Sequence, residues 1–433
     1  MSEVVVNEPL AEASAPSSAS VLPKLFQIAW RNVWRNKRRT LLTVGGIIFA
    51  VWLLVFMRSF QVGVFSQMAD MTARAMPGHA QIQDPRYEDE PLMEHTIDAS
   101  LAKAQLLETR QFEFVSSRLQ GSAILSVNEL SSAGMLMGVE PKIEAKWSGL
   151  KKNVVSGRYI SSTGEMFIGE SMARNLGASL GDDLIVLGTA KNGGIAAHVG
   201  QIVGIFRTGS QEIDRSLVQM HISDFREAWS MDANEAHSVV AIAPTLSESE
   251  EAVKRLRNEG LDSKEQRLMG WQDLLPEVVS MTEMKDVSTT FMFFFLALIV
   301  VFAVVNAFMM LIYERTNEMG VLLALGMRPH QLLLQFQIEG LIISGVGVIL
   351  AIGFTLLTLW PLSSYGLALP PSVLEAYPEE FMRNMPKRLY PGLDWDSMRL
   401  ATVVIVLGVQ LAAFIPSLRI FRLRPVEAIK AEN

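Results

Sequence analysis

The sequence contains no cysteine among its 433 residues. Disulfide bonds, thiolate metal sites and a cysteine nucleophile are therefore excluded. The six histidines do not form the His-Glu-x-x-His pattern of a zinc protease. Basic residues are also too few for a surface that follows a phosphate backbone, because the formal net charge is −7. We therefore expect no nucleic-acid partner and no metal site.

A phosphate-binding loop of the form Gly-x-x-x-x-Gly-Lys-Ser/Thr is also missing from the sequence. The segment Gly169-Glu170-Ser171 matches only the first part of a hydrolase nucleophile elbow, and Ala173 stands where the closing glycine would be. We therefore predict that the chain is not an enzyme and that it holds no cofactor of its own.

Charged residues are scarce at 19%, whereas hydrophobic residues make up 49% and the mean hydropathy is +0.26. Four apolar runs are long enough to cross a bilayer, which takes roughly 20 helical residues. The sequence thus predicts an integral membrane protein with four transmembrane α-helices. A large α+β two-part extracytoplasmic domain is inserted between the first and second helices. The predicted spans are 40–60, 288–313, 336–360 and 399–418.

Lysine and arginine residues flank the first and last spans, which predicts that both termini are cytoplasmic. Residues 1–20 read as a disordered tail, and 419–433 as a second cytoplasmic tail. The segment 21–39 carries Trp30 and Trp34 four residues apart among arginines, which predicts an amphipathic basic helix on the inner membrane surface. On this topology, 61–286 and 361–398 lie outside, and 314–332 is the only internal cytoplasmic loop.

The predicted external domain, 61–286, is too long for a connecting loop. Its periodicity indicates an α+β part formed by 61–144 and 236–286, and a β-rich insert at 145–235. Apolar residues recur with helical spacing over 98–120 and again over 247–260.

Polar residues inside an apolar span usually face another helix, because an unpaired polar group is costly in a bilayer. We interpret Asn306 and Gln410 as interhelical hydrogen-bonding groups rather than as substrate contacts. Large apolar residues gather at the predicted outer edge of the first two spans, where they suit a lateral opening for acyl chains, although such residues are also ordinary interface material. These candidate contacts are Phe56, Phe60, Phe65, Met281 and Met284.

The predicted cytoplasmic loop begins with charged residues and then turns apolar. Its residues Asn317 to Leu325 suit a short helix with Met319, Leu322 and Leu323 on one exposed face that needs a protein partner. Gly326 suits the position after the end of that helix. The residues by themselves are equally compatible with a plain charged loop.

Several stretches resemble the MacB/LolC/FtsX permease superfamily of ABC transporters, the mechanotransmission class. They are IAWRNVWRNKRRTLLTVGGI (28–47), GRYI (157–160), IGESMARNLGASLGDDLIVLG (168–188), GQIVGIFRTG (200–209), DRSLVQMHISD (214–224), YERTNEMGVLLALGMRPHQL (313–332) and RPVEAIKAE (424–432). The resemblance implies a permease in the bacterial cytoplasmic (inner) membrane that forms a dimer with a second copy or a paralogue.

The resemblance also implies that a short helix after the second span docks a cytoplasmic ABC ATPase. Because this chain lacks a phosphate loop, we expect the ATPase, with its bound ATP and Mg²⁺, to be a separate polypeptide. The implied ATPase-coupling residues are Glu314, Arg315, Glu318, Met319, Gly320, Leu322, Leu323 and Gly326.

Within this superfamily, the two-part external domain and the lack of a fused ATPase favour extraction of a lipoprotein or another lipid-linked substrate from the membrane. Membrane lipids and a periplasmic acceptor or adaptor would then be further partners. The alternatives are a MacB-like tripartite efflux permease and FtsX-like signalling to a periplasmic partner. A sensor or scaffold that binds an external ligand is a different class, and association with an ATPase separates it from a transporter.

Overall fold

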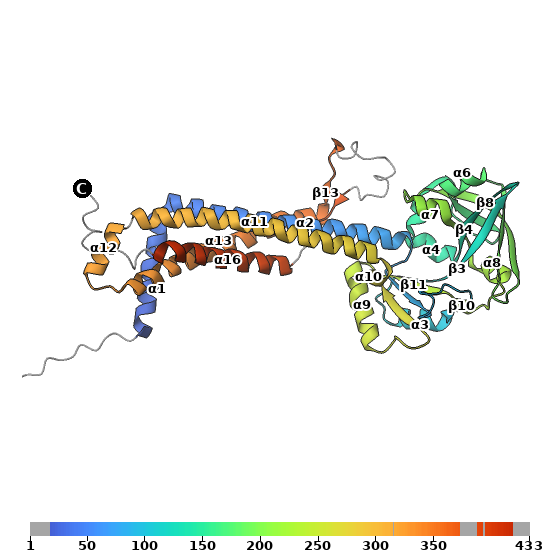
Figure 1. The fold of residues 1–433 in the computed structure, drawn as a ribbon, viewed down its shortest axis with the longest axis horizontal. Helices are drawn as coiled ribbons and strands as arrows, with labels where there is room; N and C mark the ends of the chain where they lie inside the picture. The colour runs from blue at the N-terminus through green and yellow to red at the C-terminus, as the bar shows by residue number, and fades with distance from the viewer. Residues whose placement is uncertain (1–17, 315, 373–387, 393–394, 419–433) are drawn as a thin grey trace, which may run out of the picture. The chain divides into compact units, whose positions relative to one another are not determined.

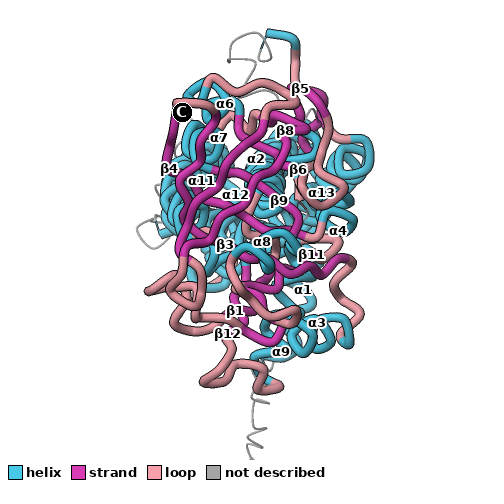
Figure 2. Tube along the Cα trace, turned by 90° about the vertical axis from the view of Figure 1, so that its right-hand side faces the viewer, coloured by secondary structure: helices cyan, strands magenta, loops and turns pink. Residues whose placement is uncertain are grey.

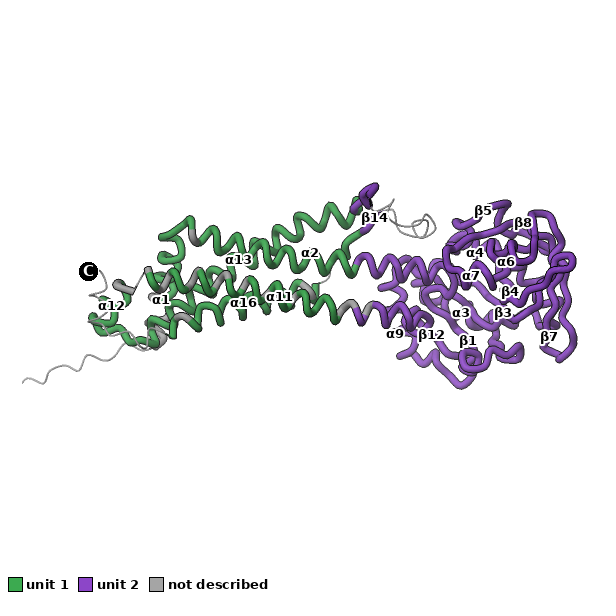
Figure 3. Tube along the Cα trace, turned by 45° about the horizontal axis from the view of Figure 1, so that its top comes forward, with its two compact units in different colours: residues 1–62, 286–366, 390–433 green, residues 63–285, 367–389 purple. Residues whose placement is uncertain are grey.

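The computed structural model describes residues 18–314, 316–372, 388–392 and 395–418. The chain divides into two compact units, which Figure 3 shows in different colours. We call Met1–Val62, Asp286–Gly366 and Tyr390–Asn433 the helical unit, and Gly63–Lys285 with Leu367–Leu389 the sheet unit. The sheet unit thus covers nearly the same residues as the predicted external domain.

Long helices build the helical unit, and in Figure 1 the first helix, drawn in blue, lies across the direction of the others. The amphipathic helix ends at Arg35 rather than at residue 39, since the chain turns at Asn36 before the next helix. The helices are α1 (Ser18–Arg35), α2 (Lys37–Ala75), α11 (Pro276–Glu314), α12 (Thr316–Ala324), α13 (Pro329–Tyr365) and α16 (Trp395–Ser417).

Three of the described helices are long and apolar enough to cross a membrane: Thr40–Ala75, Pro329–Tyr365 and Met398–Ile415. The remaining predicted span, 288–313, lies inside α11, where the structure leaves some side chains undescribed and a shorter apolar stretch is found, Val287–Leu296. The count of four spans therefore stays a prediction.

The long helices pack through small and apolar side chains. A Cβ atom on Gly347 of α13 would come within 2.7 Å of Ile47 on α2, so glycine allows these two helices to approach closely. The Trp52 indole Nε1 donates a hydrogen bond to Thr358 Oγ1 at 3.0 Å across the same pair of helices. Many large apolar side chains remain exposed on the outside of the unit, among them Leu42, Ile349 and Leu357, as suits helices surrounded by lipid.

A ten-stranded sheet forms the centre of the sheet unit. Figure 2 shows its strands as magenta tubes, from β12 and β1 at one end to β8 and β5 at the other. The order is β12-β1-β11-β3-β4-β9-β6-β8-β5, and β7 pairs with both β3 and β8. The strands are β1 (Ala80–Gln83), β3 (Phe114–Val127), β4 (Leu130–Val139), β5 (Val154–Gly157), β6 (Glu165–Gly169), β7 (Asp183–Thr189), β8 (Ile195–Phe206), β9 (Leu217–His221), β11 (Ser238–Ile242) and β12 (Arg267–Gly270).

Strand pairs in this sheet are antiparallel except β4 with β9 and β6 with β8, which are parallel. Two small antiparallel pairs lie apart from the large sheet: β2 (Ile97–Asp98) with β10 (Glu235–Ala236), and β13 (Leu367–Ala368) with β14 (Arg388–Leu389). The shorter helices of the unit are α3 (Ala99–Glu108), α4 (Pro141–Trp147), α5 (Gly149–Lys152), α6 (Glu170–Leu176), α7 (Gln211–Ser216), α8 (Ile222–Ala228), α9 (Leu246–Asn258) and α10 (Trp271–Leu274).

The long strand β3 belongs to both halves of the sheet. Its first residues pair with β11, and its later residues pair with β4 and β7. One hydrophobic core gathers residues from β1, α3, β11 and α9, and a second gathers residues from β3, β4, α6 and α8. The two cores therefore meet between Val115 and Leu119 of β3. The division of the external domain at 144/145 and 235/236 stays a prediction.

The helical spacing over 98–120 does not correspond to a single helix. Helix α3 ends at Glu108, and Arg110 adopts a positive φ of 55°. From Phe114 onward the chain is the strand β3. The apolar residues after the turn pair across the sheet, so tertiary pairing overrides the local spacing. The helical spacing over 247–260 corresponds to α9.

A buried ion pair connects β3 with α4 and with the end of α2. Arg118 donates from Nε to Glu144 Oε1 at 2.7 Å and from Nη2 to Glu144 Oε2 at 2.9 Å, and both side chains are almost fully buried. Ser116 Oγ also donates to Glu144 Oε1, and Arg118 donates to the carbonyl of Met76. The guanidinium carbon lies 5.0 Å from the centre of the Trp147 ring.

We predict that Arg118→Met destabilises the sheet unit by about 3–5 kcal/mol, because it leaves the Glu144 carboxylate buried without its cation. Urea unfolding of the detergent-solubilised chain, followed by tryptophan fluorescence, measures this. The pair of Arg158 with Glu165 provides the control, since the Arg158 side chain is 56% exposed and Arg158→Met should cost much less stability. Equal effects of the two substitutions would contradict the prediction.

A second buried polar group, His237, lies beside Tyr87, with the two rings stacked 4.9 Å apart. The backbone N–H of Gln120 donates to His237 Nδ1 at 2.9 Å, so the neutral ring carries its proton on Nε2, 3.4 Å from the Met93 carbonyl oxygen. Burial lowers the pKa of His237 to about 4 from 6.5.

Because the pKa of this ring is lower in the folded than in the unfolded chain, only the unfolded chain gains the proton between about pH 6.5 and pH 4. We predict that the sheet unit loses on the order of 3 kcal/mol of stability as the pH falls through this window. In His237→Gln, whose side-chain oxygen still accepts a hydrogen bond, urea unfolding should depend less on pH. The same pH dependence in both proteins would contradict the assignment.

Candidate functional site

The predicted coupling segment folds as the short helix α12, followed by a tight turn into α13. The turn is made by Gly326, whose φ is +94°, a conformation that favours glycine. The N–H of Gly326 donates to the Leu323 carbonyl at 3.1 Å, and that of Met327 donates to the Leu322 carbonyl at 3.0 Å. Pro329 then begins α13, where a missing N–H costs nothing.

The apolar side chains of α12 that are exposed differ from those predicted. The prediction that Met319, Leu322 and Leu323 form an exposed face is wrong: Met319 is 2% exposed, and both leucines are partly buried. They belong to the cluster that also contains Ala29 and Val33 of α1, and Leu332 and Phe336 of α13. Helices α1 and α13 of the same chain therefore cover the apolar side of α12.

The exposed apolar side chains of this segment are instead Val321 and Leu325, at 48% and 78% exposure. Gly320 is buried with Met319. Two of the predicted coupling residues, Arg315 and the side chain of Glu314, lie outside the described residues. A partner protein that docks on α12 would thus meet Val321 and Leu325 first.

An ion pair ties α12 to α1. Arg35 Nη2 donates to Glu318 Oε1 at 2.7 Å and to Oε2 at 3.0 Å. The side chains are 56% and 53% exposed, so the pair contributes only about 0–1 kcal/mol. Its importance is geometric, because it joins the helix before the first span to the loop between the second and third predicted spans.

A buried carboxylate ties α1 to α13. Glu339 is 1% exposed, and its Oε1 accepts hydrogen bonds from Asn32 Nδ2 at 2.9 Å and from Gln335 Nε2 at 3.4 Å. A carboxylate in an apolar core is tolerated only when it is hydrogen-bonded. Sequence reasoning missed this contact, because its partners are 307 residues apart. The available signals were an asparagine in the basic helix and a glutamate in an apolar one.

The two predicted interhelical polar residues have no such contact in the described part of the chain. Asn306 is exposed on α11. Gln410 is half-buried on α16, and its Nε2 has no hydrogen-bond partner among the described residues. Their role stays a prediction. Besides Asn32–Glu339, Thr289 of α11 donates from Oγ1 to Gln61 Oε1 of α2 at 2.6 Å.

The candidate lateral-opening residues are divided between the two units. In the helical unit, Phe56 and Phe60 continue an aromatic series along α2: Phe56 lies 5.3 Å from Trp52 and is stacked 6.2 Å from Phe60. Phe65 is half-buried in the sheet unit. Met281 and Met284, on the part of α11 that belongs to the sheet unit, are strongly exposed.

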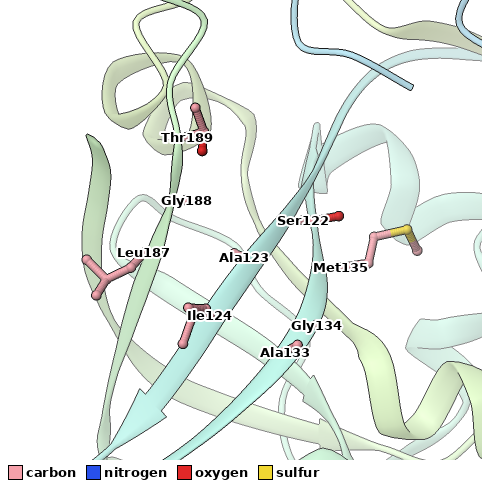
Figure 4. A pocket seen from close by; sticks show the side chains of 9 residues that line it. All are labelled: Ser122, Ala123, Ile124, Ala133, Gly134, Met135, Leu187, Gly188 and Thr189. Carbon is pink, nitrogen blue, oxygen red and sulfur yellow. The ribbon is translucent and has the colours of Figure 1, made fainter. Parts of the chain in front are cut away.

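The sheet unit has a shallow hollow of about 620 Å³ between β3, β4 and β7 (Figure 4). Two of its lining residues are glycines, Gly134 and Gly188, and its polar side chains are the hydroxyls of Ser122 and Thr189. Ile124 and Leu187, which are paired across β3 and β7, add apolar surface. No lining side chain is charged, so the hollow suits contact with apolar groups rather than acid–base chemistry.

Comparison with known proteins gives two family models. Residues 40–259 match the model described as the MacB-like periplasmic core domain. Residues 290–425 match the model described as the FtsX-like permease C-terminal. The first model covers most of α2 and the sheet unit as far as residue 259, and the second covers most of the helical unit beyond α2.

Curated relatives match most of the chain. It is 24% identical over 409 residues to the lipoprotein-releasing system transmembrane protein LolC of Xylella fastidiosa, covering 89% of this chain and 91% of that one. It is 23% identical over 385 residues to the pyoverdine export ATP-binding/permease protein PvdT of Pseudomonas fluorescens, covering 82% of this chain and 55% of that one. Among solved structures, the periplasmic region of MacB from Actinobacillus actinomycetemcomitans matches at 16% identity and a TM-score of 0.34, covering 46% of this chain and 92% of that chain.

We predict that Met319→Asp and Leu325→Asp differ sharply in their effect on the helical unit. The buried methionine position cannot solvate a carboxylate, so Met319→Asp should lower stability by about 3 kcal/mol or more. The exposed Leu325→Asp should change stability by about 0.5 kcal/mol or less. Thermal unfolding in detergent measures both. A stable Met319→Asp variant would show that α12 does not pack on this core.

Proposed function

Because the chain belongs to the family of FtsX-like permeases with a MacB-like periplasmic core domain, we propose that it releases lipoproteins or other lipid-linked substrates from the inner membrane. A member of this family is an ABC transporter permease, which implies an ATPase partner and often a second permease. The observation that carries the proposal is the match to a LolC protein over 89% of this chain and 91% of the relative.

In this proposal, ATP and Mg²⁺ bind to a separate ATPase, and this chain catalyses no reaction itself. The ATPase docks on α12 through the exposed side chains Val321 and Leu325. Apolar side chains exposed in a cytoplasmic loop are the kind of surface that a partner groove covers.

Motion of α12 would reach the long helices through three contacts within the helical unit. Arg35–Glu318 joins α12 to α1, and Asn32–Glu339 joins α1 to α13. The buried side chain of Met319 packs in the same core as Leu332 and Phe336 near the start of α13. Because packed cores transmit displacement rather than absorb it, α12, α1 and the start of α13 should move as one block.

The proposal includes four spans with both termini in the cytoplasm and the sheet unit outside. The chain would form a dimer with a second copy or a paralogue, and Asn306 and Gln410 would find hydrogen-bond partners there. Phe56, Phe60, Phe65, Met281 and Met284 are the proposed apolar contacts for acyl chains. A soluble periplasmic acceptor or adaptor would take the released substrate.

The main alternative is efflux of a periplasmic substrate. The match to PvdT, whose name describes an export protein, covers 82% of this chain and supports it. Signalling to a periplasmic partner is a third function, and it would need no transported substrate. Lipoprotein release, efflux and signalling would all use the same docking helix. They differ in the molecule that the external domain would bind.

The test is release of a lipidated protein from proteoliposomes that contain the chain and the ATPase encoded beside it. We predict that ATP drives release to a soluble acceptor. Val321→Glu and Leu325→Glu should each lower ATPase co-purification and release about tenfold, because an unpaired charge would be buried in the docking interface. Ile195→Glu is the matched control, since Ile195 is at least as exposed as Val321 and Leu325 but lies in the sheet unit.

An ATPase that fails to associate with the wild-type chain would overturn the transporter proposal. Association and ATP hydrolysis without lipoprotein release would instead favour efflux or signalling. Wild-type release by both docking variants would show that α12 is not the docking element.

A further inference from the structure

The helix α1 presents an exposed surface that combines tryptophan with arginine. Its inner side, Leu25, Ala29 and Val33, is buried in or against the helical unit. On its outer side, Trp30 and Trp34 are 44% and 37% exposed, with their rings edge to face at 6.0 Å. We define the basic–aromatic surface as Trp30, Arg31, Trp34 and Arg35 together with Lys37 and Arg38 at the start of α2.

The charge of this surface is entirely positive. Helix α1 contains no acidic residue. Arg31, Lys37 and Arg38 are exposed and make no ion pair or hydrogen bond with the residues that the structure describes. Arg35 has one carboxylate partner there, Glu318 of α12.

Indole rings beside guanidinium groups match the chemistry of a phospholipid interface. Tryptophan prefers the headgroup region, where its ring is in apolar surroundings and its N–H stays solvated. Arginine binds phosphate oxygens through two parallel hydrogen bonds. A basic helix with this pattern is attracted to anionic lipid by about 1 kcal/mol for each cation near the surface.

We propose that the basic–aromatic surface binds the phosphate of anionic phospholipid headgroups, and that Arg35 exchanges between this phosphate and Glu318. The exchange is energetically accessible, because both side chains of the pair are more than half exposed and such an ion pair is weak. When Arg35 holds a lipid phosphate, α12 loses its polar contact with α1. Lipid composition would thereby control how firmly the ATPase-docking helix is held. This control rests on the proposed function, whereas the lipid binding does not.

Lipid binding is tested on the full chain in nanodiscs of phosphatidylcholine to which phosphatidylglycerol is added, with bound lipid counted by native mass spectrometry. Removing three charges in Arg31→Gln/Lys37→Gln/Arg38→Gln should weaken phosphatidylglycerol retention about fivefold per charge. Lys151→Gln/Lys152→Gln/Lys254→Gln removes the same charge from exposed positions of the sheet unit and should leave retention unchanged. Equal retention by the two triple variants would overturn the proposal.

The exchange predicts opposite changes in phosphatidylglycerol retention when Glu318 and Arg35 are substituted. Glu318→Gln frees Arg35 and should strengthen phosphatidylglycerol retention by about twofold to fivefold, whereas Arg35→Gln should weaken it. A purely structural ion pair would give no change in Glu318→Gln, and that result would overturn the exchange. Both measurements need no ATPase.

The control of docking is then measured with the ATPase present. Phosphatidylglycerol should change the ATP hydrolysis rate of the wild-type complex and not that of Arg35→Gln. If no ATPase associates, the proposed function fails while the lipid-retention results still stand. If the first triple variant loses the ATPase but keeps its phosphatidylglycerol, the surface docks a protein, and the lipid proposal is overturned.

Discussion

The buried carboxylate of Glu339 constrains how the helical unit is assembled at the end that carries α12. A carboxylate inside an apolar helix bundle requires hydrogen-bond donors, and Asn32 supplies one from α1. This hydrogen bond joins α1 to α13. With α1 in that position, Arg35 reaches Glu318, and Ala29 and Val33 join the core that receives Met319. The position of α12 therefore depends on a contact made by a different helix.

The sheet unit is stabilised by two apolar cores and a buried ion pair. Its strands bury two cores that meet along β3, and the buried Arg118–Glu144 pair joins β3 to α4 through complementary charge. The hollow on its surface offers apolar groups, hydroxyls and glycine backbone, without a charged side chain. Such a surface offers apolar contact to a partner.

Particular residues show how far sequence reasoning reached. The helix at α12, the turn at Gly326 after it and the amphipathic character of α1 follow from local spacing and glycine chemistry, which are properties of neighbouring residues. The orientation of α12 does not, because the spacing of Met319, Leu322 and Leu323 defines an apolar side without saying whether the chain itself covers it. The same limit explains residues 98–120, where helical spacing continued into a strand whose partners, β4 and β11, lie later in the chain. Similarity to relatives identified the family, although it did not indicate the Asn32–Glu339 contact.

The sequence by itself determined that this protein is a membrane permease with a MacB-like periplasmic domain, because apolar runs and short family motifs are properties of stretches of about 20 residues. The tertiary structure decided which surfaces remain available. It buried Met319, left Val321 and Leu325 exposed, and placed Arg35 between α12 and a surface rich in tryptophan and positive charge. The physical reason is that burial and ion pairing are set by residues hundreds of positions apart, and their meeting depends on how the helices pack.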